Sequence, residues 1–217
     1  MTAFFAEVMS IGLQLLARAL TAVRGLWVGV DPADVQRIYY ANHTSNGDFI
    51  MVWTALPKPI RDKTRPVAAS DYWFKSKLRK FVGEHVVKAV LIDRNPETRN
   101  ADPVELMTDA LNEGSSLIIF PEGKRNQSED DKLLRFKTGL YHVLKANPHV
   151  EAVPAWIENL NRILPKGTLL PIPLICTVTY GAPLKIKENE TKGQFLGRAH
   201  KALIATSELR ERNGDDI

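Results

Sequence analysis

The residues best suited to chemistry lie in the segment 42–48, which reads Asn-His-Thr-Ser-Asn-Gly-Asp. His43 is followed five residues later by Asp48, a spacing that one short helical turn can bridge. The Asp48 carboxylate would then accept a hydrogen bond from one imidazole N–H of His43, while the other nitrogen faces a substrate. This is a serine-protease triad without its serine, so the nucleophile would be a hydroxyl group of the substrate. A His and an Asp at this spacing also arise easily by chance, and the pair alone does not identify an enzyme.

A second segment with unusual chemistry reads Phe-Pro-Glu-Gly-Lys-Arg at positions 120–125. It follows an apolar run and places Glu122 and two cations around Pro121 and Gly123. An ordinary turn requires no such combination. The segment is therefore a second candidate for the functional site.

Both segments follow runs of residues that are typical of β-strands. Strands are predicted over 35–41, 66–70, 86–92, 116–120, 150–157 and 172–180. Helices are predicted over 49–56, 72–82, 102–112, 128–145 and 192–212, the fourth from a capping box of Ser128 and Asp131. This alternation predicts an α/β fold with a largely parallel central sheet flanked by helices. His43, Arg94 and Glu122 would lie at the carboxyl ends of strands, where such folds gather functional residues.

The first 30 residues form a segment rich in large apolar side chains, which ends before Asp31 and Pro32. Its longest uncharged stretch, 8–17, is too short to span a bilayer, and no basic residue precedes it as in a secretory signal. A helical wheel leaves one narrow polar stripe, formed by Glu7, Ser10, Gln14, Arg18 and Thr21. The apolar arc of this amphipathic helix could pack on the protein or enter a membrane interface, and the sequence leaves both readings open. We divide the chain into a membrane-associating helix, 1–30, and one domain, 31–217.

Positive charge is concentrated in the segment 58–99, which holds eleven Lys or Arg residues and five acidic residues. Such a patch attracts phosphate on nucleic acid, on anionic lipid or on a small ligand, although an ordinary solvated face has a similar composition. The single cysteine, Cys176, excludes an intramolecular disulfide and a paired-cysteine zinc site. Nothing in the composition requires an oxidising compartment, which favours a cytoplasmic location.

Taken together, the two segments and their spacing resemble the glycerolipid acyltransferases, the family of 1-acylglycerol-3-phosphate acyltransferases. The segments 42–48 and 120–125 are similar to the first and third blocks of that family's pattern. The second block is similar to 90–94, which ends in the arginine Arg94, and the fourth is similar to 153–155. The segment 136–139, Phe-Lys-Thr-Gly, is also typical of the family. The resemblance covers about residues 35–180.

Two residues depart from the family pattern. Asn126 stands in place of the usual serine after the third block, and Lys88 stands where the family often has glycine. Both are expected to flank the phosphate site, where Lys88 would add a charge, so they leave the precise acceptor open.

The resemblance implies transfer of a fatty acyl group from acyl-coenzyme A or acyl carrier protein to the hydroxyl of a lysophospholipid, above all 1-acyl-glycerol-3-phosphate. His43 would be the general base and Asp48 its orienter, with no acyl-enzyme intermediate, no metal and no cofactor beyond the donor as co-substrate. The acceptor and its phosphate would be bound by Arg94, Glu122, Gly123, Arg125 and Lys75, because guanidinium groups fit phosphate oxygens well. Glu122 could instead only orient its own loop. The implied location is the cytoplasmic face of a membrane, as a peripheral or monotopic protein.

Two rival functions remain open from the sequence. An acyltransferase could use a different acceptor, such as an amino-acid lipid or a sugar lipid. A non-catalytic protein could bind anionic lipid or nucleic acid through the segment 58–99 and the N-terminal helix. The second rival leaves both motifs unexplained, so we expect a membrane surface and no nucleic acid as partner.

Overall fold

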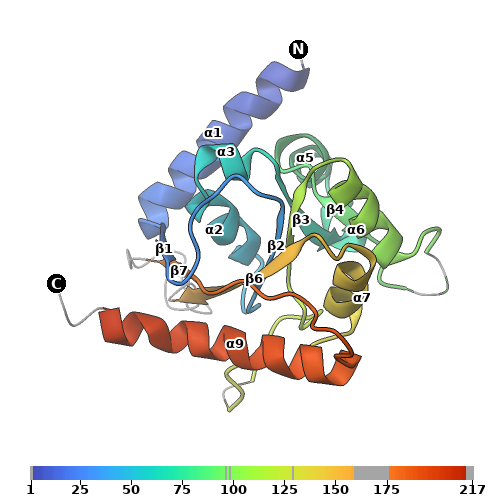
Figure 1. The fold of residues 1–217 in the computed structure, drawn as a ribbon. Helices are drawn as coiled ribbons and strands as arrows, with labels where there is room; N and C mark the ends of the chain where they lie inside the picture. Colours follow the sequence, from blue (N-terminus) through green and yellow to red (C-terminus); the bar gives the residue numbers. More distant parts are fainter. Residues whose placement is uncertain (1, 96, 98, 129, 159–175, 214–217) are drawn as a thin grey trace.

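A seven-stranded sheet runs through the protein, with helices packed on both of its faces (Figure 1). The computed structural model describes residues 2–95, 97, 99–128, 130–158 and 176–213. The strands are β1 (Arg24–Trp27), β2 (Arg37–Ala41), β3 (Thr64–Ala69), β4 (Val90–Ile92), β5 (Ser116–Ile119), β6 (Glu151–Glu158) and β7 (Thr177–Tyr180). The helices are α1 (Thr2–Thr21), α2 (Asp48–Ala55), α3 (Lys58–Arg61), α4 (Ser70–Trp73), α5 (Lys77–Phe81), the π-helical turn η1 (Val82–Val86), α6 (Pro103–Asn112), α7 (Gly139–Ala146) and α9 (Lys192–Asn213).

The sheet has the strand order β1-β7-β6-β2-β5-β3-β4. Its neighbouring strands are parallel except for β6 and β7, which are antiparallel. The predicted α/β fold with a largely parallel sheet is therefore confirmed. Because β2, β3, β4 and β5 run in the same direction, their carboxyl ends lie along one edge of the sheet, and this edge carries the candidate site.

Two cores fill the spaces between the sheet and its helices, and the alternation of side chains along β2 supplies both. Ile38 and Tyr40 pack on one face with α6, α7 and α9, while Tyr39 and Ala41 pack on the other face with α2. All of β2 is buried, which is expected of a central parallel strand covered on both faces.

α1 packs on the protein through a narrow face of Ala6, Met9 and Leu13, which joins a core cluster with Trp73 and Val86. The large apolar side chains on the rest of the helix are 50–67% exposed, namely Phe4, Phe5, Val8, Ile11, Leu15 and Leu16. One side of the helix thus packs on the protein, as the first reading predicts, and the other side stays exposed. Entry of the exposed side into a membrane interface stays a prediction. The side chains of Arg18 and Thr21 in the predicted polar stripe lie outside the described residues. No described helix is long and apolar enough to cross a membrane.

The N-terminal segment departs from the prediction at its end, because α1 stops at Thr21 and the chain forms β1 instead of continuing as a helix towards residue 30. β1 pairs in parallel with β7, and Trp27 stacks on Tyr180 with 4.2 Å between ring centroids. Gly25 permits this packing, since a Cβ there would lie 2.9 Å from the carbonyl oxygen of Ala55. The apolar residues that favoured a helix serve equally well in a strand, which is why the pattern did not separate the two.

The predicted helix 72–82 and strand 86–92 are also divided differently. Ser76 has an extended backbone and its Oγ accepts a hydrogen bond from the Arg79 amide at 3.2 Å, so it caps α5 and separates it from α4. The π-helical turn η1 follows over Val82–Val86, so β4 is shorter than predicted and contains Val90–Ile92. Trp73 lies against the backbone of Gly83, where a Cβ would be 2.8 Å from its ring. This tertiary contact was not visible in the local sequence.

The helix predicted over 128–145 begins only at Gly139. The predicted bond of the capping box does form, with the Asp131 amide donating to Ser128 Oγ at 3.1 Å, but no helix follows it. Two amides further along donate to the segment 120–125 instead: Leu134 N–H to Glu122 Oε2 at 2.9 Å and Lys137 N–H to the Pro121 carbonyl at 2.8 Å. These contacts hold the chain as a loop across the candidate site. Of the predicted strand 172–180, residues 172–175 lie outside the described residues.

Candidate active site

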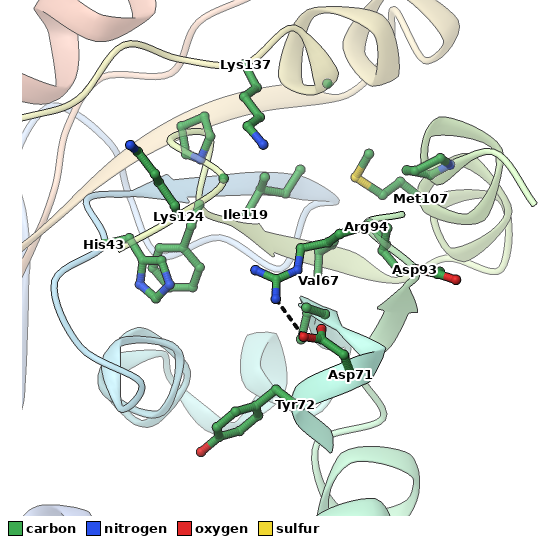
Figure 2. A pocket seen from close by; sticks show the side chains of 18 of the residues that line it. His43, Val67, Asp71, Tyr72, Asp93, Arg94, Met107, Ile119, Lys124 and Lys137 are labelled. Carbon is green, nitrogen blue, oxygen red and sulfur yellow. Dashed lines mark hydrogen bonds and ion pairs between the residues drawn. The ribbon is translucent and has the colours of Figure 1, made fainter. Parts of the chain in front are cut away.

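A cavity of about 1110 Å³ lies at the carboxyl ends of β3, β4 and β5, next to the loop that follows β2 (Figure 2). Five of the seven predicted site residues line it: His43, Lys75, Arg94, Gly123 and Arg125. The other two, Asp48 and Glu122, are buried and do not line the cavity. The structure therefore separates residues that can face a substrate from residues that hold them in place.

The His43 ring is held by the Asp48 carboxylate, with 2.8 Å between His43 Nδ1 and Asp48 Oδ2. The same oxygen accepts hydrogen bonds from the amides of Thr44 at 2.6 Å and Ser45 at 2.8 Å. Asp48 is the first residue of α2 and is fully buried. Its carboxylate is thus fixed by its own loop, and it fixes the imidazole in turn.

The orientation of His43 leaves its second ring nitrogen for the cavity. The side chain is 22% exposed and its ring stacks on Phe120, with 4.5 Å between centroids and 26° between planes. A carboxylate at Nδ1 favours the tautomer that carries its proton there, so Nε2 has a lone pair available to accept a proton. This arrangement suits a general base that acts on a group bound in the cavity.

The Glu122 carboxylate joins the two motifs through the backbone. Its Oε1 accepts a hydrogen bond from the His43 amide at 2.7 Å, and its Oε2 accepts one from the Leu134 amide at 2.9 Å. Burial raises the pKa of Glu122 above its ordinary value, and these two amide bonds oppose the shift. The expected contact between Glu122 and the acceptor is therefore revised, because both of its oxygens accept from backbone amides and the residue is only 2% exposed. The geometry favours the role in which it orients the loop.

Arg94, Arg125 and Lys75 bring positive charge to the cavity from different segments of the chain. Arg94 Nη2 forms an ion pair with Asp71 Oδ2 at 2.7 Å, which holds the guanidinium over the cavity (Figure 2). Both side chains are more than half exposed, so this pair positions the arginine more than it stabilises the fold. A base beside several cations suits a substrate that carries both a hydroxyl and a phosphate group.

Known proteins resemble this chain in sequence and in fold. A sequence profile described as acyltransferase matches residues 31–158. The chain belongs to the acyltransferase family. It is 28% identical over 182 residues to a 1-acyl-sn-glycerol-3-phosphate acyltransferase from Cocos nucifera, a match covering 81% of this chain and 55% of the relative. The chain thus spans about half the length of that relative.

Among solved structures, this acyltransferase is similar to the 1-acyl-sn-glycerophosphate (LPA) acyltransferase PlsC from Thermotoga maritima. The TM-score is 0.68 with 19% sequence identity, and the match covers 94% of this chain and 81% of PlsC. At this identity the likeness concerns the fold.

The two departures from the acyltransferase pattern do not line the cavity, contrary to our expectation that they flank a phosphate site. Lys88 is exposed and has a φ of +49°, a conformation that favours glycine, which accounts for the glycine common at this position. The Asn126 side chain donates to the Asp131 carbonyl at 2.7 Å and accepts from the Ser128 amide at 2.9 Å. Its backbone amide donates to the His43 carbonyl at 2.6 Å, so this residue joins loops instead of facing a ligand.

The cavity also contains cations that the sequence did not single out, namely Arg79, Arg99, Lys124 and Lys137. Lys137 belongs to the segment 136–139, whose likeness to the family was the one available signal. The described residues include no group of three His, Cys, Asp or Glu side chains that could hold a metal ion.

Proposed function

We propose that the protein transfers a fatty acyl group from acyl-coenzyme A or acyl carrier protein to the hydroxyl of 1-acyl-glycerol-3-phosphate or a related lysophospholipid. The observation that carries the proposal is the His43–Asp48 pair, joined at 2.8 Å, beside a cavity lined by Lys75, Arg94 and Arg125. The two relatives named above bear the name of this activity, which supports the choice of acceptor. A phosphate-bearing acceptor also explains the cations better than an uncharged lipid would.

In the proposed reaction, His43 Nε2 accepts the proton of the acceptor hydroxyl as its oxygen attacks the thioester carbonyl carbon. The new carbon–oxygen bond forms and the carbon–sulfur bond breaks. The thiolate that leaves takes the proton from the imidazolium, which restores His43 and releases a free thiol and an ester. Asp48 keeps the ring in its productive tautomer and stabilises the positive charge that develops on it. Since the substrate supplies the nucleophile, no acyl-enzyme forms.

The test is thiol release from acyl-coenzyme A, and separately from acyl-loaded carrier protein, in the presence of 1-acyl-glycerol-3-phosphate. His43→Ala is expected to lower kcat by about 100-fold or more. His149→Ala, an exposed histidine outside the cavity, is the matched control and should keep wild-type turnover. Equal rates for His43→Ala and wild type would refute the role of the base. No turnover of wild type with any lysophospholipid would refute the proposed function.

We further propose that the protein acts at the cytoplasmic face of a membrane, as a peripheral or monotopic protein, with α1 in the interface. The large exposed side chains of α1 support this, because soluble proteins rarely leave so contiguous an apolar face uncovered. Phe74 and Leu78, beside the basic residues of α5, are also exposed. Both substrates carry acyl chains, and the donor carriers are cytoplasmic molecules.

This membrane proposal is tested by sedimentation with phospholipid vesicles. The double variant Phe4→Ser/Leu15→Ser changes only exposed positions and leaves the packed face of α1 intact. It should move to the supernatant, whereas Glu7→Gln on the same helix should sediment like wild type. Full sedimentation of the double variant would contradict the role of α1. Truncation is less informative, because β1 follows α1 closely and belongs to the sheet.

A further inference from the structure

The side chain of Lys137 lies over Gly123 in the third block of the family pattern. A Cβ at position 123 would lie 2.6 Å from Lys137 Cδ and Cε and 3.0 Å from Nζ. Gly123 also has a φ of +68°, which side chains rarely adopt. The Lys137 amide donates to the Pro121 carbonyl at 2.8 Å, so both the backbone and the side chain of the lysine are placed against this loop. Position 123 therefore leaves room for the aliphatic part of Lys137 and directs its ammonium group.

The Lys137 ammonium points into the cavity from the side opposite Arg94, and Lys124 and His43 lie to the left of both in Figure 2. Among the described residues that line the cavity there are seven Lys or Arg and three Asp. The three acidic side chains, Asp71, Asp93 and Asp102, all come from the segment between α4 and α6. The opposite wall contributes only cations and neutral residues among those described.

The net charge therefore differs between the two walls. Arg94 is paired with Asp71, and Arg79 lies over the Tyr72 ring at 4.7 Å. In the described part of the chain, no ion pair within 4.0 Å involves Lys124, Arg125 or Lys137. The opposite wall has four cations, Lys75, Arg79, Arg94 and Arg99, but also the three Asp side chains. Net positive charge is thus concentrated on the wall formed by the third block and the residues just before α7. That wall is anchored to His43 through the hydrogen bond from the Asn126 amide to the His43 carbonyl.

The structures of the two substrates indicate whether the acceptor phosphate or a donor phosphate binds to the cations of this wall. In the acceptor, the phosphate and the attacking hydroxyl sit on neighbouring carbons of one glycerol unit, so a hydroxyl at His43 brings its phosphate close to the base. In either donor, the whole pantetheine arm separates the thioester from the nearest phosphate. Cations on the wall anchored to His43 are therefore placed for the acceptor.

We propose that Lys137 binds the phosphate of the acceptor and that Gly123 serves to keep its side chain in place. The inference rests on the proposed function and adds a binding residue to the same site. Lys137 acts in it together with Arg125, as a point charge beside a guanidinium that can bind two phosphate oxygens.

The first experiment compares Lys137→Met with Lys137→Arg and with Lys145→Met, a lysine on the following helix α7 that does not line this cavity. Lys137→Met is expected to raise KM for 1-acyl-glycerol-3-phosphate about tenfold or more, while KM for the acyl donor and kcat change little. Turnover of monoacylglycerol, which lacks the phosphate, should be unaffected, so the preference for the phosphorylated acceptor falls. Lys137→Arg should recover most of the loss, and Lys145→Met should behave as wild type.

A second variant tests the part played by Gly123. Gly123→Ala places a methyl group where Lys137 lies, so it should raise KM for the acceptor in the same way. Adding Gly123→Ala to Lys137→Met should then cause a smaller rise than in wild type, because the side chain it displaces is already gone and only the backbone strain at a φ of +68° remains. Circular dichroism melts identify any variant whose loss comes from unfolding. Full additivity of the two effects in folded proteins would overturn the role of Gly123.

Direct binding of 1-acyl-glycerol-3-phosphate without donor, measured by calorimetry below its micellar concentration, gives a readout independent of turnover. Weaker binding to Lys137→Met than to wild type supports the proposal. It does so even if no donor yields product, because lack of product would refute only the proposed function. Unchanged acceptor binding, or a rise in KM for the donor instead of the acceptor, would overturn the assignment of Lys137.

Discussion

Replacing Glu122 by glutamine tests whether this residue organises the site or touches the substrate. The two side chains have nearly the same shape, but glutamine has one acceptor oxygen and one NH2 group. Glu122 accepts from the His43 amide at 2.7 Å and the Leu134 amide at 2.9 Å, so one of these buried N–H groups must face the NH2 group in the variant. The substitution therefore changes the hydrogen bonding of the loop without creating a cavity.

The magnitude follows from the two hydrogen bonds. Hydrogen bonds to a charged group contribute about 1.5–3 kcal/mol each, and a buried donor left without a partner costs about 1–3 kcal/mol. An opposing contribution comes from burial, which raises the pKa of Glu122. A raised pKa means that the stability linked to this group is present at low pH and is lost as the pH rises through the raised value, which is a cost above that pH. Glutamine removes that cost, and we expect a net loss of about 1–3 kcal/mol in the free energy of unfolding.

The assay combines thermal unfolding with steady-state kinetics. For a chain of this size, such a loss lowers Tm by about 3–9 °C, and displacement of the His43 backbone should lower kcat by about tenfold with little change in KM for the acceptor. Glu113→Gln is the matched control, because its carboxylate is 68% exposed and pairs with Arg65 at the surface. A Glu122→Gln protein with wild-type stability and a raised KM for the acceptor alone would refute the reasoning, since it would place Glu122 against the substrate.

Two further predictions concern positions outside the cavity. Lys88→Gly should raise the free energy of unfolding by about 0.5–1 kcal/mol in urea titrations, because Lys88 has a φ of +49°. Lys88→Ala keeps the Cβ and should show no gain, so equal stability of the two variants would contradict the conformational explanation. The Arg198 side chain donates to Glu190 at 2.8 Å and 2.6 Å, and this contact lowers the pKa of Glu190. The stabilisation from this ion pair is present above the ordinary glutamate pKa and is lost as the pH falls through the lowered pKa. Glu190→Gln should therefore flatten the acid side of a curve of unfolding free energy against pH. A curve parallel to that of wild type would contradict this prediction.

The fold was largely predictable where one local pattern decides the structure. β2 is a short run of β-formers, and α6 begins at Pro103 after Asp102, whose side chain accepts from the Val104 amide at 2.6 Å as its N-cap position predicts. The errors occur where tertiary contacts override local signals. Residues 130–138 form a loop because the amides of Leu134 and Lys137 donate to the third block, and no local pattern reveals that competition.

The candidate site divides in the same way. His43 and Asp48 are close in sequence, so their contact could be inferred from spacing. The direction of the Glu122 carboxylate could not be inferred from the sequence, because it depends on the position of the Leu134 amide, which follows the loop. Lys137 was not singled out as a site residue for a related reason: a lysine has no fixed reach, and only its position over Gly123 shows where the ammonium group goes.

The first and third blocks of the acyltransferase pattern are joined by hydrogen bonds to the backbone of His43. Its amide donates to Glu122 Oε1 at 2.7 Å, and its carbonyl accepts from the Asn126 amide at 2.6 Å, so the segment 122–126 holds the base on both sides. Arg125 lies inside that segment, and Lys137 is tied to it through Pro121 and Gly123. In the proposed reaction the base and the cations that bind the acceptor phosphate therefore keep a fixed separation. A glycerol phosphate also has a nearly fixed distance between hydroxyl and phosphate, so binding the phosphate would by itself bring the hydroxyl to His43.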